Sequence, residues 1–325
     1  MGGRRDSRRD LSRGLRRYVV AVQALYEAAG RLMIGPASGS GVPEDAHPVF
    51  DAHFHIGPYG TQAFAGRRIM PIPEALDHAS GADCAAYLAR HGIDAGVIVP
   101  TYLDRQEAAF EYNALLIDAV EAYPNLYGGL WVSPLPQVES LLHAALARLP
   151  HPKVRALKIA SNTWAPYGID PASWDRSVQR NMERILEAAA GHGLVIHFHT
   201  GYLPGADPLE FDLFLQQYGH RATYQLVHCG EAIAPAFTFV PRFPGWIEEG
   251  FDVYTDTSIV PGFAPRWLLD ELDRRNLGFG RVLFATDSPW GFFPAEYWKI
   301  AGLDLDPEVK EQIFWGNAAR LYGVG

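Results

Sequence analysis

The sequence has few of the residues that build disulfide-bonded, cysteine-ligated or membrane-spanning proteins. It holds two cysteines in 325 residues, Cys84 and Cys229, which lie far apart and form no C-x-x-C pair. Neither a disulfide framework nor a cysteine zinc site is indicated, and reduced thiols in the cytoplasm are expected. The best apolar run near the start, residues 18–34, contains three polar or charged residues, whereas a membrane span needs about 20 nearly uncharged ones. We therefore expect a soluble, cytoplasmic protein that makes no contact with a membrane.

Basic residues are scarce beyond the first 17 positions. Residues 1–17 hold seven arginines and two aspartates, and the rest of the chain has 21 basic and 35 acidic residues, a net charge of −14. Nucleic-acid binding requires a clustered excess of Lys and Arg, so it is not expected of the main body. We interpret residues 1–46 as an Arg-rich helical arm with a linker, which would pack on the body or on a second subunit of a homo-oligomer.

Residues 47–325 alternate between short apolar runs typical of strands and amphipathic stretches typical of helices. Eight strands are predicted: 49–56, 95–100, 126–133, 154–160, 194–200, 223–229, 252–258 and 282–288. The predicted helices are 82–91, 107–123, 138–149, 177–192, 208–218, 241–249, 265–277 and 308–322. No glycine-rich nucleotide loop follows the first strand, as an open doubly wound sheet would favour. Eight such units in about 250 residues predict a (β/α)8 TIM barrel of the α/β class over residues 47–325.

Polar residues gather at the carboxyl ends of the predicted strands, where a barrel of this class builds its site. Two H-x-H pairs, His53/His55 and His197/His199, end the first and fifth strands, whereas chance placement of 12 histidines would give fewer than one pair. His228 ends the sixth strand and Asp287 the eighth. Residues two apart on a strand point the same way, so each pair can enter the barrel mouth. Neutral imidazole is a common ligand of divalent metals, and the pattern indicates a metal site.

These residues resemble the amidohydrolase superfamily, in its amidohydrolase-related branch that includes aminocarboxymuconate semialdehyde decarboxylase. The resemblance covers about residues 47–325. The matching motifs are FDAHFH at 50–55, HTG at 199–201, VHCGE at 227–231, ATDSP at 285–289 and WGNAARLY at 315–322. It implies that His53, His55, His199 and Asp287 bind one divalent ion, zinc or else manganese. It also implies that His228 lies beside the ion as a catalytic acid or base.

Two residues depart from the pattern of that branch. His197 stands where an apolar or amide residue is more usual, so either His197 or His199 could be the ligand; we favour His199 because Thr200-Gly201 places it at the strand end. Lys158 lies on the fourth predicted strand, where other branches carboxylate a lysine to bridge two metals. We interpret it as an unmodified lysine that orders water or a substrate carboxylate.

The resemblance leaves two reactions open. A metal-activated water could hydrolyse a small amide, ester or lactone, with Asp287 accepting the proton and His228 stabilising the oxyanion or protonating the product. The alternative is non-oxidative decarboxylation of an aromatic or unsaturated acid at the same site. The two differ in whether a cation anchors a carboxylate.

Further residues near the strand ends are candidates for contact with a small-molecule substrate. Tyr202, Trp290, Phe292 and Phe293 follow the fifth and eighth strands and suggest an aromatic wall. Glu231 is a candidate to orient His228, or only a helix-start residue. The candidate carboxylate anchors are Arg67, Arg68 and Arg242, each of which is more typical of a solvated surface.

Overall fold

The computed structural model describes residues 47–58, 63–64, 67–68, 78–102, 106–201, 203 and 205–324. The predicted arm and linker, residues 1–46, lie outside these ranges. A two-stranded antiparallel hairpin, β2 (Ala63–Phe64) and β3 (Arg67–Arg68), is separate from the main sheet. In the described part of the chain, no helix combines the length and the apolar character that crossing a membrane would require.

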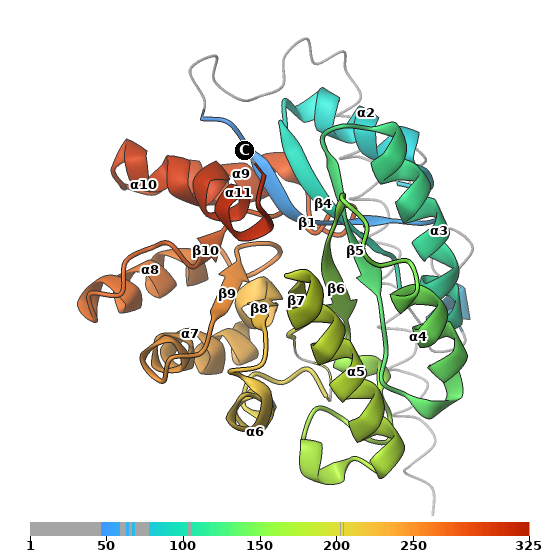
Figure 1. The fold of residues 1–325 in the computed structure, drawn as a ribbon. Helices are drawn as coiled ribbons and strands as arrows, with labels where there is room; N and C mark the ends of the chain where they lie inside the picture. The colour runs from blue at the N-terminus through green and yellow to red at the C-terminus, as the bar shows by residue number, and fades with distance from the viewer. Residues whose placement is uncertain are drawn as a thin grey trace, which may run out of the picture. The chain divides into compact units, whose positions relative to one another are not determined.

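Eight parallel strands form the main sheet, in chain order (Figure 1). They are β1 (Phe50–Ile56), β4 (Ala95–Pro100), β5 (Leu126–Trp131), β6 (Val154–Ile159), β7 (Val195–Phe198), β8 (Thr223–Leu226), β9 (Val253–Asp256) and β10 (Val282–Leu283). The backbone also links the last strand segment to the first: Ala52 N donates to Phe284 O at 3.0 Å and Asp287 N donates to His53 O at 2.7 Å. These bonds close the sheet, and the predicted (β/α)8 barrel is confirmed.

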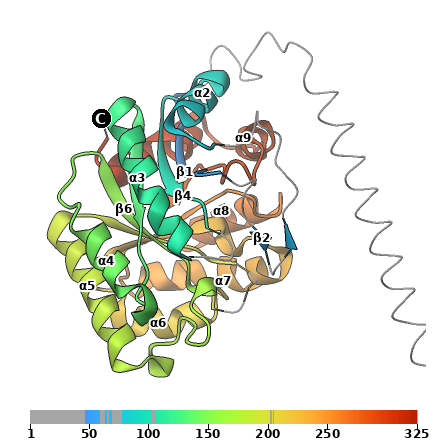
Figure 2. The ribbon, with the colours of Figure 1, turned by 90° about the vertical axis from the view of Figure 1, so that its right-hand side faces the viewer.

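Helices follow the strands and surround them in Figures 1 and 2. They are α2 (Gly81–His91), α3 (Gln106–Ala122), α4 (Glu139–Leu146), α5 (Arg176–His192), α6 (Glu210–Tyr218), α7 (Ile233–Glu248), α8 (Ala264–Arg274), α9 (Phe293–Ala301), α10 (Pro307–Glu311) and α11 (Asn317–Tyr322). Short helical turns are η2 (Pro136–Val138), η3 (Ser161–Thr163), η4 (Pro171–Ser173), η5 (Val227–Gly230) and η6 (Gln312–Gly316). This is the covering layer that parallel strands require.

Two helix predictions were wrong in their extent. We expected a helix from Pro241, yet α7 begins at Ile233 and carries Pro241 and Pro244 inside it. A proline removes one backbone hydrogen bond, but the buried aromatic side chains on this helix, Phe243 and Trp246 among them, hold it in place. The predicted final helix is divided into α10, a wider π turn at η6, and α11.

The barrel interior changes from apolar to polar along β6 and β7. Ala156 on β6 and Val195 on β7 are paired neighbours in the buried hydrophobic core. Two residues further along, on the same face, Lys158 and His197 are paired, and His197 is paired with Gln225 on β8. A buried polar layer therefore lies directly above the apolar core, towards the carboxyl ends of the strands.

Candidate metal centre

Three donor atoms converge at the carboxyl end of β1. His55 Nε2 lies 2.9 Å from Asp287 Oδ1, and His53 Nε2 lies 3.2 Å from the same oxygen. All three residues are buried. Ligands bonded to zinc at about 2.1 Å in a tetrahedral arrangement are about 3.4 Å apart, so these separations are those of ligands around one ion.

A second group shares His53 but lies deeper. His53 Nδ1 is 3.6 Å from Asp256 Oδ2, and His197 completes the group, with its ring centroid 4.5 Å from that of His53. Both ring nitrogens of His197 and Nδ1 of His53 are buried without a hydrogen-bond partner. Unpaired buried imidazole nitrogens carry a desolvation cost that a bound cation would remove.

His199 belongs to neither group of three donors found among the described residues. Its Nε2 lies 3.9 Å from Glu231 Oε2, and its ring centroid is 5.3 Å from that of His228. A Cβ at Gly201 would collide with Glu231 Oε2 and crowd His199 Nε2, so the glycine leaves room for these two side chains to lie together. The structure thus places Glu231 beside His199.

His228 was predicted at the end of a strand, but it lies in the turn that follows β8. β8 ends at Leu226, and His228 occupies η5 with a left-handed backbone φ of 70°. Its ring centroid is 4.9 Å from that of His53, and its Nδ1 lies 2.8 Å from Ser258 Oγ. Ser258 and Asp256, which sequence analysis missed, therefore contact the predicted acid–base residue. Asp256 ends β9, and the strand-end criterion that identified Asp287 would have found it.

Burial holds the clustered imidazoles in their neutral form. Desolvation, followed by repulsion from Lys158, lowers the pKa of His55 to about 3 and the pKa of His199 well below its usual value. The pKa values of His53, His197 and His228 are likewise lowered, chiefly by desolvation. Neutral imidazole has the free lone pair that metal binding requires.

Lys158 and Asp287 are two ionisable residues of this buried layer. Lys158 Nζ lies 3.4 Å from His53 Nε2, and burial lowers its pKa to about 8. Burial raises the pKa of Asp287 well above its usual value, against the lowering effect of Lys158. A carboxylate in this environment is stabilised by a nearby cation. The donor set, its neutral histidines and its unpaired nitrogens therefore fit a divalent ion, with His53, His55 and Asp287 as converging ligands and His197 and His199 as the further candidates.

Asp51 ties the first strand to the segment that carries Asp287. Its carboxylate accepts hydrogen bonds from Thr286 N at 3.0 Å, Thr286 Oγ1 at 2.5 Å and Tyr87 OH at 3.2 Å. Asp287 has a φ of 55°, a conformation that costs a non-glycine residue about 1–3 kcal/mol and persists only where its surroundings hold it. These bonds therefore position a ligand, a role that the sequence analysis did not assign to Asp51.

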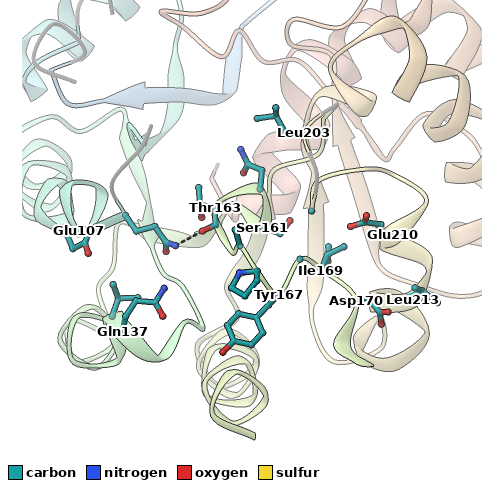
Figure 3. A pocket seen from close by; sticks show the side chains of 17 residues that line it. Glu107, Gln137, Ser161, Thr163, Tyr167, Ile169, Asp170, Leu203, Glu210 and Leu213 are labelled. Atoms are coloured by element: carbon teal, nitrogen blue, oxygen red, sulfur yellow. Dashed lines mark hydrogen bonds between the residues drawn. The ribbon is translucent and has the colours of Figure 1, made fainter. Parts of the chain in front are cut away.

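A cavity of about 1010 Å³ opens at the same end of the barrel, among the segments that follow β4, β5, β6 and β7. Figure 3 shows Glu107 and Gln137 on one side, Asp170 and Glu210 on the other, and Ser161 between them. The described residues that line it include three carboxylates and neither a lysine nor an arginine. Burial and the nearby Asp207 and Asp170 raise the pKa of Glu210. The described part of the lining is therefore acidic.

The other predicted contact residues have varied positions. Trp290 and Phe292 are 46% and 39% exposed, but Phe293 is buried at the start of α9 and packs on Phe284, so it cannot form part of an aromatic wall. Arg242 is also excluded as an anchor, because on α7 it pairs with Asp212 and Glu249. Tyr202 lies outside the described residues. The side chains of Arg67 and Arg68 are not described either.

Comparison with known proteins identifies the family but no individual relative. The family model described as "Amidohydrolase" matches residues 50–324. No curated protein matches the sequence significantly.

Several solved structures share the fold at low sequence identity. The 5-carboxyvanillate decarboxylase of Sphingomonas paucimobilis is 16% identical with a TM-score of 0.62, covering 86% of this chain and 100% of its own. A probable 2-pyrone-4,6-dicarboxylic acid hydrolase of Acinetobacter baumannii is 13% identical with a TM-score of 0.61, covering 85% and 99%. The 2,6-dihydroxybenzoate decarboxylase of Rhizobium is 13% identical with a TM-score of 0.58, covering 86% and 99%. Since the family model spans most of the chain and agrees with the barrel, the chain belongs to the amidohydrolase family.

Proposed function

We propose that this protein is a metal-dependent hydrolase of a small ester, amide or lactone that carries no additional carboxylate. The observation that carries the proposal is the convergence of His53 and His55 on one oxygen of Asp287, at the same end of the barrel as the acid-lined cavity. His53, His55, His199 and Asp287 would hold one divalent ion, zinc or manganese. When bound, the ion would polarise the scissile carbonyl and lower the pKa of water near it.

The chain itself supplies the groups that move protons. Asp287 Oδ1 faces the two histidines, which leaves Oδ2 to accept a proton from the attacking water and pass it to the leaving group. His228 lies 4.9 Å from His53, ring centroid to ring centroid, and acts beside it as the second proton-exchanging group. Lys158 is fully buried next to His53 and orders the water or the substrate without modification.

The cavity supports a neutral or cationic substrate. Glu107, Asp170 and Glu210 would repel a second carboxylate, and the described residues that line the cavity include no lysine or arginine. Gln106 Nε2 donates to Thr163 O at 2.9 Å, which ties the start of α3 to the η3 turn across the cavity. Glu231 and Trp290, and Tyr202 outside the described residues, are the further candidates for substrate contact.

Decarboxylation of an aromatic acid is the second candidate. The observation in its favour is that decarboxylases of substituted benzoates share the fold, one of them with bound manganese. Lys158, the buried basic residue beside the metal centre, would then donate a hydrogen bond to the substrate carboxylate.

A substrate panel separates the two reactions. Purified protein loaded with zinc or with manganese is given neutral esters, amides and lactones, and in parallel hydroxybenzoates, while acid release and carbon dioxide release are followed. We expect acid release from the neutral substrates and its loss on chelation. Carbon dioxide release from hydroxybenzoates, without hydrolysis of any neutral substrate, would replace the hydrolase by the decarboxylase.

Metal analysis of two matched variants tests the ligand choice. His199→Asn should lower the bound metal per chain, whereas His197→Asn should retain more of it. The reverse result would assign the ligand role to the deeper His197, which lies in the group with His53 and Asp256.

A further inference from the structure

Asp256 is the centre of a buried hydrogen-bond network at the end of β9. Its Oδ1 accepts from Ser258 Oγ at 2.6 Å, from Ser258 N at 3.1 Å and from His228 N at 3.2 Å. Its Oδ2 accepts from Gln225 Nε2 at 2.7 Å, and the whole side chain is buried. Both carboxylate oxygens are therefore used as acceptors.

The Asp256 carboxylate decides which group donates and which accepts in each hydrogen bond of this network. Gln225 presents its Nε2 to Asp256 and its Oε1 to the hydroxyl of Tyr322, so its amide orientation is consistent on both sides. Ser258 has a single hydroxyl hydrogen, and it gives this hydrogen to Asp256 Oδ1, which can only accept. At Ser258 Oγ the remaining partner is His228 Nδ1, 2.8 Å away, which must therefore donate.

The same carboxylate also holds the backbone of His228. His228 N donates to Asp256 Oδ1 while the residue adopts a φ of 70°, and Cys229 follows with a φ of 46°. Two successive left-handed residues outside glycine are strained, and the bond from His228 N to this buried acceptor helps to hold them. The position of the ring and the placement of its proton therefore depend on one group.

We propose that Asp256 and Ser258 form a relay that fixes His228 in the tautomer with its hydrogen on Nδ1, so that Nε2 acts as an acceptor towards the attacking water. Asp256 and Ser258 are positioning residues that act through His228. A neutral His228 in this tautomer has no Nε2–H to offer an oxyanion, which removes oxyanion stabilisation from its possible roles. That the partner of His228 Nε2 is the attacking water rests on the proposed function. The tautomer itself does not depend on that function.

Nitrogen NMR of the zinc-loaded protein labelled with 15N-histidine tests the relay directly. The His228 signals are identified by their loss in His228→Gln. We expect the wild type to show a protonated Nδ1 and an unprotonated Nε2. A protonated Nε2 with an unprotonated Nδ1 would overturn the proposal, whether or not any variant folds.

Three variants connect the tautomer to turnover. Ser258→Ala should lose the fixed tautomer and lower kcat by about 10–100-fold with little change in KM, as for other residues that orient a ligand or base. Ser258→Thr keeps the hydroxyl and should recover the tautomer and most of the loss. Thr257→Val is the matched control, because its buried hydroxyl on the adjacent residue has no hydrogen-bond partner.

The outcomes are distinguishable from a failure of the proposed function. If Ser258→Ala keeps the wild-type tautomer, the relay is wrong even if kcat falls, because the loss is then only structural. If the tautomer is as expected but no ester, amide or lactone is hydrolysed, the relay stands and the hydrolase assignment fails.

Discussion

Replacing Lys158 by methionine should tighten metal binding. The Lys158 ammonium lies 3.4 Å from His53 Nε2, a ligand atom of the proposed ion. At an effective dielectric of about 20, two unit charges about 4 Å apart repel by about 4 kcal/mol, and a divalent ion doubles that figure. This repulsion favours loss of the lysine proton when the ion binds.

Losing a proton is the cheaper way to relieve this repulsion. Burial lowers the pKa of Lys158 to about 8, so removing its proton at pH 7 costs about 1.4 kcal/mol, far less than the repulsion. Metal binding should therefore release the lysine proton in the wild type. The release of this proton raises the dissociation constant of the metal about tenfold at pH 7. The effect fades above pH 8, where the lysine is mostly neutral before the metal binds.

Competition between the protein and a chelator for zinc, measured from pH 6.5 to 9, provides the assay. Lys158→Met should bind zinc about tenfold more tightly than the wild type at pH 7, and the two curves should meet near pH 9. Lys153→Met is the control, because Lys153 precedes the opposite, amino-terminal end of β6. Weaker binding by Lys158→Met would refute the reasoning, since it would mean that Lys158 helps to hold the ion, as a carboxylated lysine does.

Three further predictions concern catalysis, stability and assembly. His228→Ala should retain metal and lose most turnover, whereas Asp287→Ala should lose both; metal analysis with steady-state rates checks this, and full activity of the first variant would contradict the role of His228. Burial raises the pKa of Glu296 from 4.5 to about 7. Between these two pH values the folded protein keeps a proton on Glu296 that the unfolded protein releases, so the free energy of unfolding falls as the pH rises from 4.5 to 7. In Glu296→Gln the free energy of unfolding, measured with urea, should lack this loss of about 3 kcal/mol between pH 4.5 and 7. The same pH dependence of the free energy of unfolding in both proteins would disprove the prediction. Deleting residues 1–45 should leave turnover intact and dissociate the homo-oligomer that we propose, measured by light scattering; an unchanged molecular mass per particle would rule out an assembly role.

Much of the barrel and part of its site could be predicted from sequence because their signals are local. The alternation of strand and helix patterns predicts parallel strands, and parallel strands place their carboxyl ends at one rim. His53, His55 and Asp287 were selected on this criterion, and the structure brings them together. The same criterion was not applied to Asp256, although it ends β9 in the same way.

Other features depend on contacts between segments distant in the chain. Arg242, a candidate anchor that is more typical of a solvated surface, pairs with Asp212 and Glu249 instead, and its own segment does not predict these contacts. Phe293 was misplaced because α9 was not recognised, and its side chain enters the core.

The amino-acid sequence alone determined the order of the barrel units and which imidazoles and carboxylates reach its rim, because side-chain direction along a strand repeats every two residues. Only the tertiary structure decided that His197 pairs across to Lys158 and Gln225, that Glu231 meets His199, and that Asp256 and Ser258 hold His228. Those arrangements depend on the register between neighbouring strands and on the left-handed turn after β8. Both are set by packing between segments that are distant in the chain, and such packing produces no repeating sequence pattern from which it could be predicted.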